Sequence, residues 1–592
     1  MFNPNLTLLS YKGQNVSQKN IIGDSQMTKI KVLLLLGLIA QSVYAHRGHN
    51  YGGTEKAFGK KGTIDVQVVD KKTKKFTPSR ITVINQKGKL VRLTRATKKR
   101  TAVRKGIFYF DGEKGQFNLK PGRYQIFAGK GFEWSLSKKE VEIKKNELLK
   151  LKFEIERVVD TKGYVASDTH VHVLKYSKHG DIRLNERMVT IAGEGIELPI
   201  ATDHNHNTDY TPIQKELEFD DHFTPIVGNE VTTRIGHINA FPMDPLDKRP
   251  SPYLRTWEAF NEKIREKGAE VLILNHPRWR KKNGNPEGPF GKFGLNRVTG
   301  SFKEIKGFPF NALELENSMT PVSKNEPLPF FILKDWMGLL NQGYRVTVVG
   351  GSDSHTVAGI VGQARSYVKS STDNPAEINE EEVVESFKKG RVLVSKGIFS
   401  DLSLFNKYNV GDTVSLKDES EIKGTITVRA PGWVKPKEVF VFVNGDIAWK
   451  KKITKEEGKP IDIKLNFKVP RPKIDAYLFV YVLGDGISEH YWKTKDPFTM
   501  AATNPIFIDV DGDGSYLAPK KLALEWIEEN EVSLIALEDQ IKDLEPLIGV
   551  QVMDILFQKP KITPKDLLEK VLENLSLKSK LFKLYKEERL KD

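Results

Sequence analysis

The chain has 592 residues, of which 39% are hydrophobic, and a formal net charge of +17. It is long enough for several packed domains and too apolar to be disordered throughout. It contains no cysteine, which excludes disulfides, thiolate metal sites and cysteine nucleophiles, so any transition metal must be held by His, Asp and Glu. The positive charge favours anionic partners such as phosphorylated compounds, envelope polymers or lipid headgroups. No nucleic-acid-binding motif accompanies it, and no nucleic-acid partner is expected.

Residues 27–45 have the three-part pattern of a secretory signal peptide. A basic start precedes a short apolar core, and a small-residue cleavage motif ends at Ala45. A buried helix is the alternative, but the order of the three parts favours export to a periplasmic or secreted location after cleavage near Ala45. Residues 1–26 are polar and do not belong before a signal peptide, so translation is expected to begin at Met27. Residues 46–61 are expected to be flexible.

Residues 62–157 predict an all-β domain. Short segments of alternating hydrophobicity are separated by turn signals such as Asp111-Gly and Pro121-Gly. Short, evenly spaced strands favour a β-sandwich. The second turn and the strand after it resemble a carboxypeptidase-regulatory or transthyretin-like module. The segment has no catalytic cluster, which suggests a spacer or a polymer-binding domain.

Strands and helices alternate from residue 158 to residue 398, a pattern that predicts a parallel sheet or barrel. Each expected helix is followed by a glycine, the residue that helix C-termini favour. Asn379 and Glu382 are placed to form a capping box at the start of one helix. The expected helices cover 184–194, 256–267, 328–342 and 379–389.

Metal-type side chains follow the apolar strand segments of this region. On a strand, alternate side chains share a face, so those of Asp168, His170 and His172 point the same way. Similar groups recur downstream: Asp203 and His204, Glu230, His276, Glu314 and Glu316, and Asp353 and His355. Active sites of α/β barrels lie at the C-terminal ends of the strands. Scattered core histidines would not produce this recurrence, so we expect a metal site.

Most of these residues, together with His237, lie within six short motifs: HVH at 170–172, TDHN at 202–205, GNEV at 228–231, GHINA at 236–240, NHP at 275–277 and GSDSH at 351–355. Their order and spacing resemble the PHP (polymerase and histidinol phosphatase) superfamily, and within it the CehA/McbA-type metallohydrolases. The resemblance covers about residues 160–510. It implies a distorted (β/α)7 barrel over 158–398 and a centre of two or three zinc, manganese or iron ions.

The resemblance also implies a set of metal ligands: His170, His172, His179, His204, Glu230, His237, His276, Asp353 and His355. In that scheme Glu230 bridges two ions, and Asp181 competes with His179 for one ligand position. Asp203 would orient a histidine, and Asp168 would take a supporting role. Glu314 matches a family carboxylate.

A further pair of histidines, His206 and His222, is expected to be exposed and uninvolved.

The expected chemistry is hydrolysis by a metal-activated water. Glu230, Asp353 and Arg278 are the candidate catalytic residues, with Arg278 neutralising phosphate charge or else serving a surface role. A phosphoesterase acting on a small-molecule or envelope-polymer anion is the first interpretation. Hydrolysis of a carboxylic ester, carbamate or amide is the second, and a non-catalytic envelope-binding protein is the third. The basic Gly/Pro-rich stretch 279–296 suggests either a lid or a disordered loop.

Residues 399–518 return to a β pattern and predict a second sandwich-like domain. The acidic stretch 509–514 resembles a calcium loop, but Lys520 stands where such a loop needs Glu, which favours an acidic turn. Residues 519–592 predict a helical tail, with a last helix opening at Thr563-Pro564. This basic tail is a candidate for peripheral membrane contact, with packing on the body as the alternative.

Overall fold

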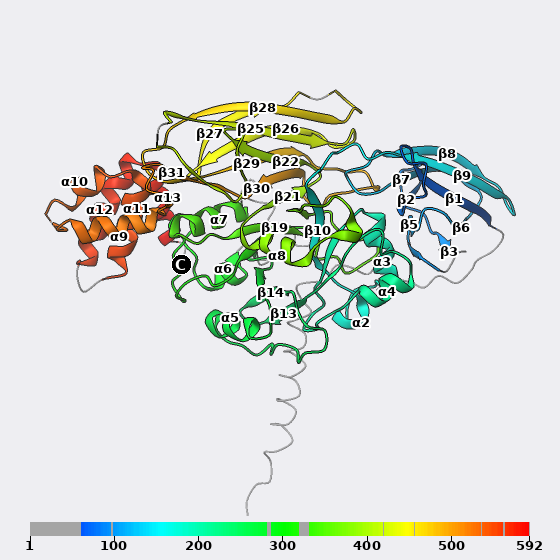
Figure 1. Ribbon diagram of the computed structural model, residues 1–592, viewed down its shortest axis with the longest axis horizontal. Helices are drawn as coiled ribbons and strands as arrows, with labels where there is room; N and C mark the ends of the chain where they lie inside the picture. The colour runs from blue at the N-terminus through cyan, green and yellow to red at the C-terminus, as the bar shows by residue number, and fades with distance from the viewer. Residues whose placement is uncertain are drawn as a thin grey trace, which may run out of the picture. The chain divides into compact units, whose positions relative to one another are not determined.

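The computed structural model describes residues 61–95, 99–280, 286–318, 331–417, 419–454, 456–533, 535–559 and 563–590. The predicted signal peptide, the residues before it and nearly all of the segment expected to be flexible lie outside the described residues. The fold is mixed α/β with several sheets, in agreement with the sequence pattern (Figure 1). Within the described residues, no helix is long and apolar enough to cross a membrane.

The N-terminal β-domain consists of two sheets that share one core. The strands of the first sheet, in sheet order, are β3 (Thr94–Arg95), β6 (Gly115–Leu119), β1 (Gly62–Asp70) and β9 (Leu148–Ile155). Those of the second are β4 (Thr101–Arg104), β5 (Ile107–Phe110), β2 (Ser79–Asn85), β7 (Gly122–Gly129) and β8 (Ser137–Ile143). In β1 the residues that face inward, Ile64, Val66 and Val68, are fully buried. This alternation is what a strand with one buried face requires.

Two sheets form the central part of the chain. An eleven-stranded sheet contains, in order, β12 (Ile226–Val227), β11 (Leu198–Ala201), β10 (Tyr164–Val171), β20 (Arg365–Lys369), β21 (Val392–Lys396), β30 (Phe498–Thr503), β29 (Ala476–Asp485), β26 (Pro436–Val443) and β27 (Asp446–Lys452). Its other two strands are β31 (Ile506–Asp509), which also pairs with β29, and β24 (Thr413–Ser415), which pairs with β31. A five-stranded sheet contains β13 (Asn229–Thr233), β14 (Gly236–Phe241), β15 (Val271–Leu274), β18 (Ala312–Asn317) and β19 (Thr347–Gly351).

The ends of the two sheets meet at one edge. Strands β10, β11 and β12 are mutually parallel, and so are β15, β18 and β19. Parallel bridges join Val171 to Ser354 and His204 to Glu230, so the C-terminal ends of strands from both sheets lie together. Strand β14 runs antiparallel to β15, which places its first residues at the same edge as the end of β15.

All four expected helices are present, with slightly different ends. They are α3 (Leu184–Gly193), α5 (Trp257–Arg265), α7 (Phe331–Gln342) and α8 (Glu380–Lys388). The side chain of Asn379 accepts a hydrogen bond from the Glu382 N–H, but the Glu382 carboxylate binds Ser371 instead of returning to Asn379. The expected capping box is therefore only half formed. Three short helices were not expected: α2 (Leu174–Ser177), α4 (Thr211–Glu216) and α6 (Pro289–Lys292).

The stretch considered as a lid contains a short hairpin, β16 (Trp279–Arg280) with β17 (Pro286–Glu287), and then α6. The hairpin loop, 281–285, lies outside the described residues.

The large sheet continues across the expected domain boundary at residue 398. Strand β21 pairs with β20 on one side and with β30, about a hundred residues later, on the other. The remaining C-terminal β strands form a four-stranded sheet: β23 (Tyr408–Asn409), β22 (Phe399–Leu404), β25 (Glu421–Ala430) and β28 (Ile461–Pro470). It packs on the large sheet through a common core that includes Ile426 and Val441. The two expected domains therefore share one sheet.

The C-terminal segment is helical, as expected. Its helices are α9 (Pro519–Glu529), α10 (Leu537–Lys542), α11 (Pro546–Phe557), α12 (Lys565–Lys578) and α13 (Lys580–Arg589). The expected last helix is two helices, because Ser579 adopts an extended conformation between them. Between α9 and α10, the hydrophobic side chain of Ile535 is exposed. Helix α11 packs against the body, where Gln551 donates a hydrogen bond to the Thr299 carbonyl.

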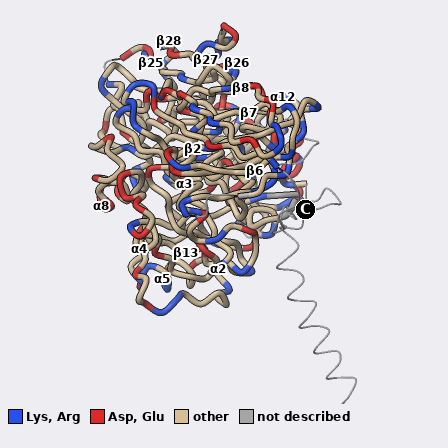
Figure 2. Tube along the Cα trace, turned by 90° about the vertical axis from the view of Figure 1, so that its right-hand side faces the viewer, with Lys and Arg blue, Asp and Glu red and all other residues tan. Residues whose placement is uncertain are grey.

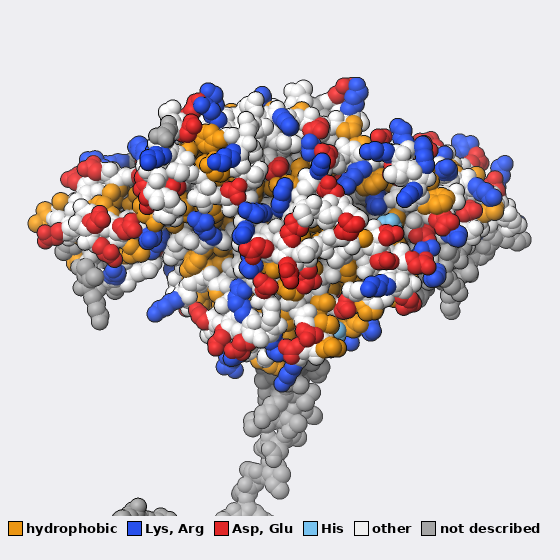
Figure 3. Space-filling model, viewed as in Figure 1, with side chains coloured by type: hydrophobic (Ala, Val, Ile, Leu, Met, Phe, Trp, Pro, Cys, Tyr) orange, Lys and Arg blue, Asp and Glu red, His pale blue; other side chains and the backbone are white. Residues whose placement is uncertain are grey.

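Lys, Arg, Asp and Glu alternate along the whole described trace (Figure 2). On the face shown in Figure 3, basic and acidic side chains are interspersed and do not form separate patches. The net positive charge is therefore spread over the surface on this face.

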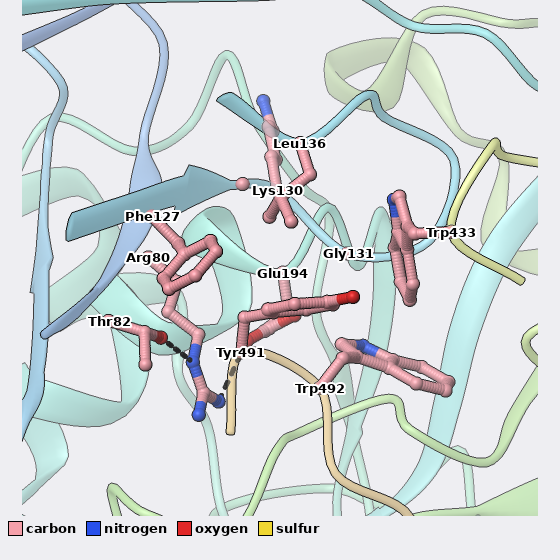
Figure 4. Close-up of a pocket in the computed structure, with 11 residues that line it drawn as sticks. Arg80, Thr82, Phe127, Lys130, Gly131, Leu136, Glu194, Trp433, Tyr491 and Trp492 are labelled. Carbon is pink, nitrogen blue, oxygen red and sulfur yellow. Dashed lines mark hydrogen bonds and ion pairs between the residues drawn. The ribbon is translucent and has the colours of Figure 1, made fainter. Parts of the chain in front are cut away.

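The N-terminal β-domain, α3 and the C-terminal β strands meet around a small crevice (Figure 4). Its floor is a buried ion pair in which Arg80 Nη1 lies 3.5 Å from Glu194 Oε1, and Trp433, Tyr491 and Trp492 form one wall. The crevice has room for roughly one water molecule, so it serves as a packed junction.

Candidate metal centre

The structure brings all nine expected metal ligands into one cluster at the edge where the strands of the two central sheets end. Seven are histidines and two are carboxylates: His170, His172, His179, His204, His237, His276, His355, Glu230 and Asp353. His237 comes from the start of β14, and the antiparallel direction of that strand explains why a residue at a strand start joins residues at strand ends.

Glu230 lies at the middle of the cluster and is fully buried. Its Oε1 is 3.2 Å from His170 Nε2 and 3.1 Å from His237 Nδ1, and its Oε2 is 2.5 Å from His204 Nδ1. One carboxylate thus contacts histidines from three different strand ends. This is the position that a carboxylate shared between two ions requires.

Within this cluster, three groups of three side chains have ligand atoms that all lie within 4.8 Å of one another. They are His172, His204 and His355; His170, His172 and Glu230; and His204, Glu230 and His237. Any two of these groups have one member in common. The donors therefore form one continuous set that is close enough to hold a metal ion.

Two buried nitrogen atoms support a metal-binding role. The Nε2 atoms of His170 and His172 are buried and make no hydrogen bond of good geometry among the described residues, although a carboxylate oxygen lies 3.2 Å from each. Leaving a buried polar atom unsatisfied costs about 1–3 kcal/mol. A cation bound at these nitrogens would remove that cost, so the residues present fit a metal ion. An all-His/carboxylate donor set suits zinc, manganese or iron.

A second layer of residues fixes the orientation of the first two histidines. His170 Nδ1 donates to Glu314 Oε1 at 2.6 Å. His172 Nδ1 donates to Ser177 Oγ at 3.0 Å, and Ser177 in turn donates to Asp203 at 2.6 Å. With Nδ1 occupied, each ring presents Nε2 to the cluster. Asp203 thus orients a histidine through Ser177.

Other supporting residues were not identified from the sequence. Asn275 Nδ2 donates to Glu230 Oε1 at 3.0 Å. The fully buried Arg187 of α3 donates to the carbonyl oxygens of His172 and Ser354, and burial lowers the pKa of its guanidinium. Asn275 belongs to the NHP motif, so the sequence could have pointed to its role. Arg187 lies on α3 outside every motif, and nothing in the sequence pointed to its role.

Two ligand candidates have unusual backbone conformations. His276 has φ of +27° and Asp353 has φ of +53°. Positive φ is disfavoured for residues other than glycine and is found at functional sites where the surroundings impose it. The Asp353 N–H donates to the His170 carbonyl at 2.8 Å, which helps to hold this conformation.

Burial and neighbouring charges set the protonation of the cluster. Burial, and then the nearby His204, lower the pKa of His172 well below its ordinary value, and burial and His172 do the same to His355. Burial would raise the pKa of Glu230, but the surrounding histidines outweigh it and hold that pKa well below its usual range. His172 and His355 are therefore neutral imidazoles and Glu230 is an ionised carboxylate, which are the forms that bind metal.

The pKa values of His170 and His276 are shifted upward, in contrast to those of His172 and His355. Burial lowers the pKa of His170, but Asp353, Glu314 and Glu230 outweigh burial and raise the pKa well above the ordinary value. The metal-free ring is thus protonated at neutral pH. A cation that binds at Nε2 must displace this proton.

The loop after α2 brings His179, not Asp181, into the cluster. The His179 ring lies 4.3 Å from the His355 ring and 4.8 Å from the His204 ring, measured between centroids. The carboxylate of Asp181 instead pairs with Arg104 at 2.9 Å.

Arg278 lies in a buried ion-pair group. Its Nη2 and Nε atoms bind Asp335 at 2.8 and 3.0 Å, and Arg297 Nε contacts the same carboxylate at 3.2 Å. Arg278, which directly follows the NHP motif in the sequence, therefore has a buried carboxylate partner in Asp335.

The other polar residues named from the sequence have structural roles. Asp168 accepts backbone hydrogen bonds from His170, Ser352 and Gly362. The expectation that His206 and His222 are exposed is wrong, because both are half-buried.

No protein-family model matches this chain, and no curated protein matches it significantly.

Proposed function

We propose that this chain is an exported, metal-dependent hydrolase of the PHP type that acts on phosphoesters. The observation that carries the proposal is the shared donor set, in which Glu230 joins two of the three groups of ligand atoms at one sheet edge. Several closely spaced donor groups are typical of centres that hold two or more ions.

The order of the strands supports a barrel. Strands β10 to β12 continue into β13 to β19 along the chain, and the bridge between Val171 and Ser354 joins the last of these strands back to the first. We infer a distorted (β/α)7 barrel in which the metal centre lies at the C-terminal face, where α/β barrels place their active sites.

We infer two or three zinc, manganese or iron ions. His170, His172, Glu230 and Asp353 would hold the first, and His179, His204 and His355 the second, with His237 and His276 available for a third. Bound ions of this kind lower the pKa of a water molecule and stabilise negative charge on the oxygens of an ester under attack.

The protein's own residues prepare this chemistry. Glu314 and Ser177 hold His170 and His172 in the tautomers that present Nε2. Asn275 fixes Glu230 through a hydrogen bond at 3.0 Å. Because these supporting contacts are buried, the ligands are held in place before any ion or substrate arrives.

Two experiments test the proposal. Metal content of the purified native protein should be at least one transition-metal equivalent per chain; a lower content would favour a non-catalytic envelope-binding role. Aryl phosphate, phosphodiester and carboxylate ester substrates should then be assayed with Mn²⁺ and Zn²⁺. Turnover of esters without turnover of phosphates would replace the phosphoesterase by a carboxylic ester hydrolase.

A substitution of Glu230 tests the assignment of the site. Glu230→Gln removes the central charge while keeping the volume, so it should abolish metal binding and turnover and leave the fold intact. The circular dichroism spectrum serves as the control for folding. Full turnover by this variant would show that the metal assignment is wrong.

A further inference from the structure

We infer that the N-terminal β-domain positions part of the metal centre, and that Arg104 is the positioning residue. Arg104 is the last residue of β4, and its side chain crosses from the N-terminal β-domain to the segment that follows α2. The inference rests on the proposed metal-binding function and assigns a role to a domain that has no catalytic cluster of its own.

Arg104 binds two carboxylates at once. Its Nε and Nη2 atoms lie 2.9 and 3.1 Å from the two Asp181 carboxylate oxygens, and its Nη1 and Nη2 atoms each lie 3.2 Å from a Glu186 oxygen. Nη2 also donates to the Asp181 carbonyl. The side chains of Arg104 and Asp181 are only 16% and 17% exposed. A planar guanidinium that binds two acids in this way is far more restrictive than a surface ion pair.

Asp181 connects Arg104 to the loop that carries His355. Its N–H donates to the His355 carbonyl at 3.0 Å, and its Oδ1 accepts from the Val357 N–H at 3.0 Å. One aspartate thus holds the backbone at His355 and at Val357, two residues further along the same loop. The same carboxylate is the main partner of Arg104.

The residue before Asp181 packs against His355 too closely for any side chain. Gly180 has φ of +87°, and a Cβ atom there would lie 2.2 Å from the His355 carbonyl oxygen. The neighbouring His179 places its ring 4.3 Å from the His355 ring. The segment from His179 to Asp181 and the His355 loop therefore move as one, and Arg104 fixes both to the N-terminal β-domain.

The restraint acts on one side of the cluster. His170 and His172 end β10 and are oriented by Glu314 and Ser177 within the central part of the chain. His179 and His355 lie on loops, which are more mobile than strands. Loss of the Arg104 contacts should therefore weaken the subsite of His179, His204 and His355 more than the subsite of His170.

The test compares two arginines of the same domain in the full-length mature protein. Arg104→Gln removes the contacts to Asp181 and Glu186. Arg100→Gln is the matched control, because Arg100 also joins the N-terminal β-domain to the central part, through Glu218 at 2.9 Å, and contacts no residue of the cluster segments among its described ion pairs.

The first readout is hydrogen–deuterium exchange of the metal-free proteins. Arg104→Gln should speed exchange in 174–182 and 353–357, and Arg100→Gln should leave both segments at the wild-type rate. The second readout is Co²⁺ titration followed by visible absorption. Arg104→Gln should weaken one class of Co²⁺ sites by about 10- to 100-fold, the usual effect of removing an outer partner of a ligand, and leave the tighter class unchanged.

Two further variants guard against a general loss of folding. Asp181→Asn keeps an oxygen for the Val357 N–H but weakens the pair with Arg104, and it should reproduce the Arg104→Gln effect without adding to it in the double variant. Arg104→Lys keeps the positive charge but loses the planar guanidinium that binds both carboxylates. Its effect on exchange and on Co²⁺ affinity should be intermediate.

Unchanged exchange in both segments of Arg104→Gln, or equal effects of Arg104→Gln and Arg100→Gln, would overturn the inference. Absence of Co²⁺ binding by the wild type would instead contradict the proposed metal-dependent function. In that case the exchange comparison would still decide whether Arg104 positions the loops.

Discussion

Glu314 accepts a hydrogen bond from His170 Nδ1 with one carboxylate oxygen and from the His276 backbone N–H with the other, both at 2.6 Å. One buried side chain thus ties together two histidines from different strand ends. Glu314 itself lies on β18, between the strands that carry them. Its position makes it the residue through which the two sides of the cluster keep their spacing.

The Glu314 contacts predict a loss of metal affinity on substitution. Glu314→Gln leaves one acceptor oxygen for two donors and removes the charge that supports His170. We expect metal affinity to fall about 10- to 100-fold, measured by titration of the metal-free protein. Glu316→Gln, two residues along the same strand, is the control for a change of charge at β18. Equal affinity in Glu314→Gln and wild type would contradict the role given to Glu314.

The raised pKa of His170 predicts that metal binding releases a proton. At pH 7 the metal-free ring is protonated, because the neighbouring carboxylates outweigh burial and raise its pKa. Isothermal titration in buffers of different ionisation enthalpy should therefore show proton release. Identical heats in all buffers would mean that His170 is already neutral.

The same pKa predicts the stability of the metal-free protein. A folded-state pKa above the unfolded value of about 6.5 gives stability that is fully present below that pH and is lost as the pH rises through the folded pKa. The melting temperature of the metal-free protein should therefore fall as the pH rises above about 6.5. Saturating metal should reverse this trend, because metal binding is favoured by deprotonation.

A buried group of three charges near the end of β18 predicts a large stability effect. Lys396 Nζ lies 2.6 Å from Glu316 and 2.9 Å from Asp496, and burial raises the pKa of Glu316 to about 7. Lys396→Met would leave two carboxylates buried without a cation and should cost about 3–5 kcal/mol in the free energy of unfolding.

The pH dependence of this cost provides its check. A carboxyl group whose folded pKa is raised loses stability as the pH rises from its unfolded pKa through the folded one. Denaturant unfolding of Lys396→Met should thus show a larger loss at pH 8 than at pH 6. A loss that does not change with pH would mean that removing Lys396 does not raise the pKa of Glu316 in the folded protein.

The signal-peptide pattern predicts the start of the mature protein. N-terminal sequencing of native protein should read from His46, because the small-residue motif ends at Ala45. A mature N-terminus before Met27 would contradict both the cleavage site and the start of translation at Met27.

The cluster could be anticipated from the sequence because its residues follow buried strands. A short apolar segment that ends in His or Asp can be recognised in the amino-acid sequence. Parallel strands then bring such ends together in the fold. His170 and Asp353 were found in this way. Ser177 and Arg187 were not. Ser177 contacts the His172 ring from a short helix that was not expected, and Arg187 binds the carbonyl oxygen of Ser354, 167 residues along the chain.

The pairing of strands that lie far apart in the sequence could not be predicted, for the same reason. The elements were found by their periodicity, but nothing local indicates that β21 pairs with β30. The same holds for the contact of Arg104 with Asp181, which joins residues 77 positions apart in the chain. Lysine and arginine are abundant here, so a single arginine at a strand end offers no signal.

The pairing of β21 with β30 has a practical consequence for dissecting the protein. A fragment that stops at residue 398 would expose the N–H and C=O groups along one edge of β21, together with the apolar side chains that β30 now covers. Such an edge is a template for pairing with other chains. Fragments that contain the metal-binding region should therefore extend through β31, and shorter ones should aggregate.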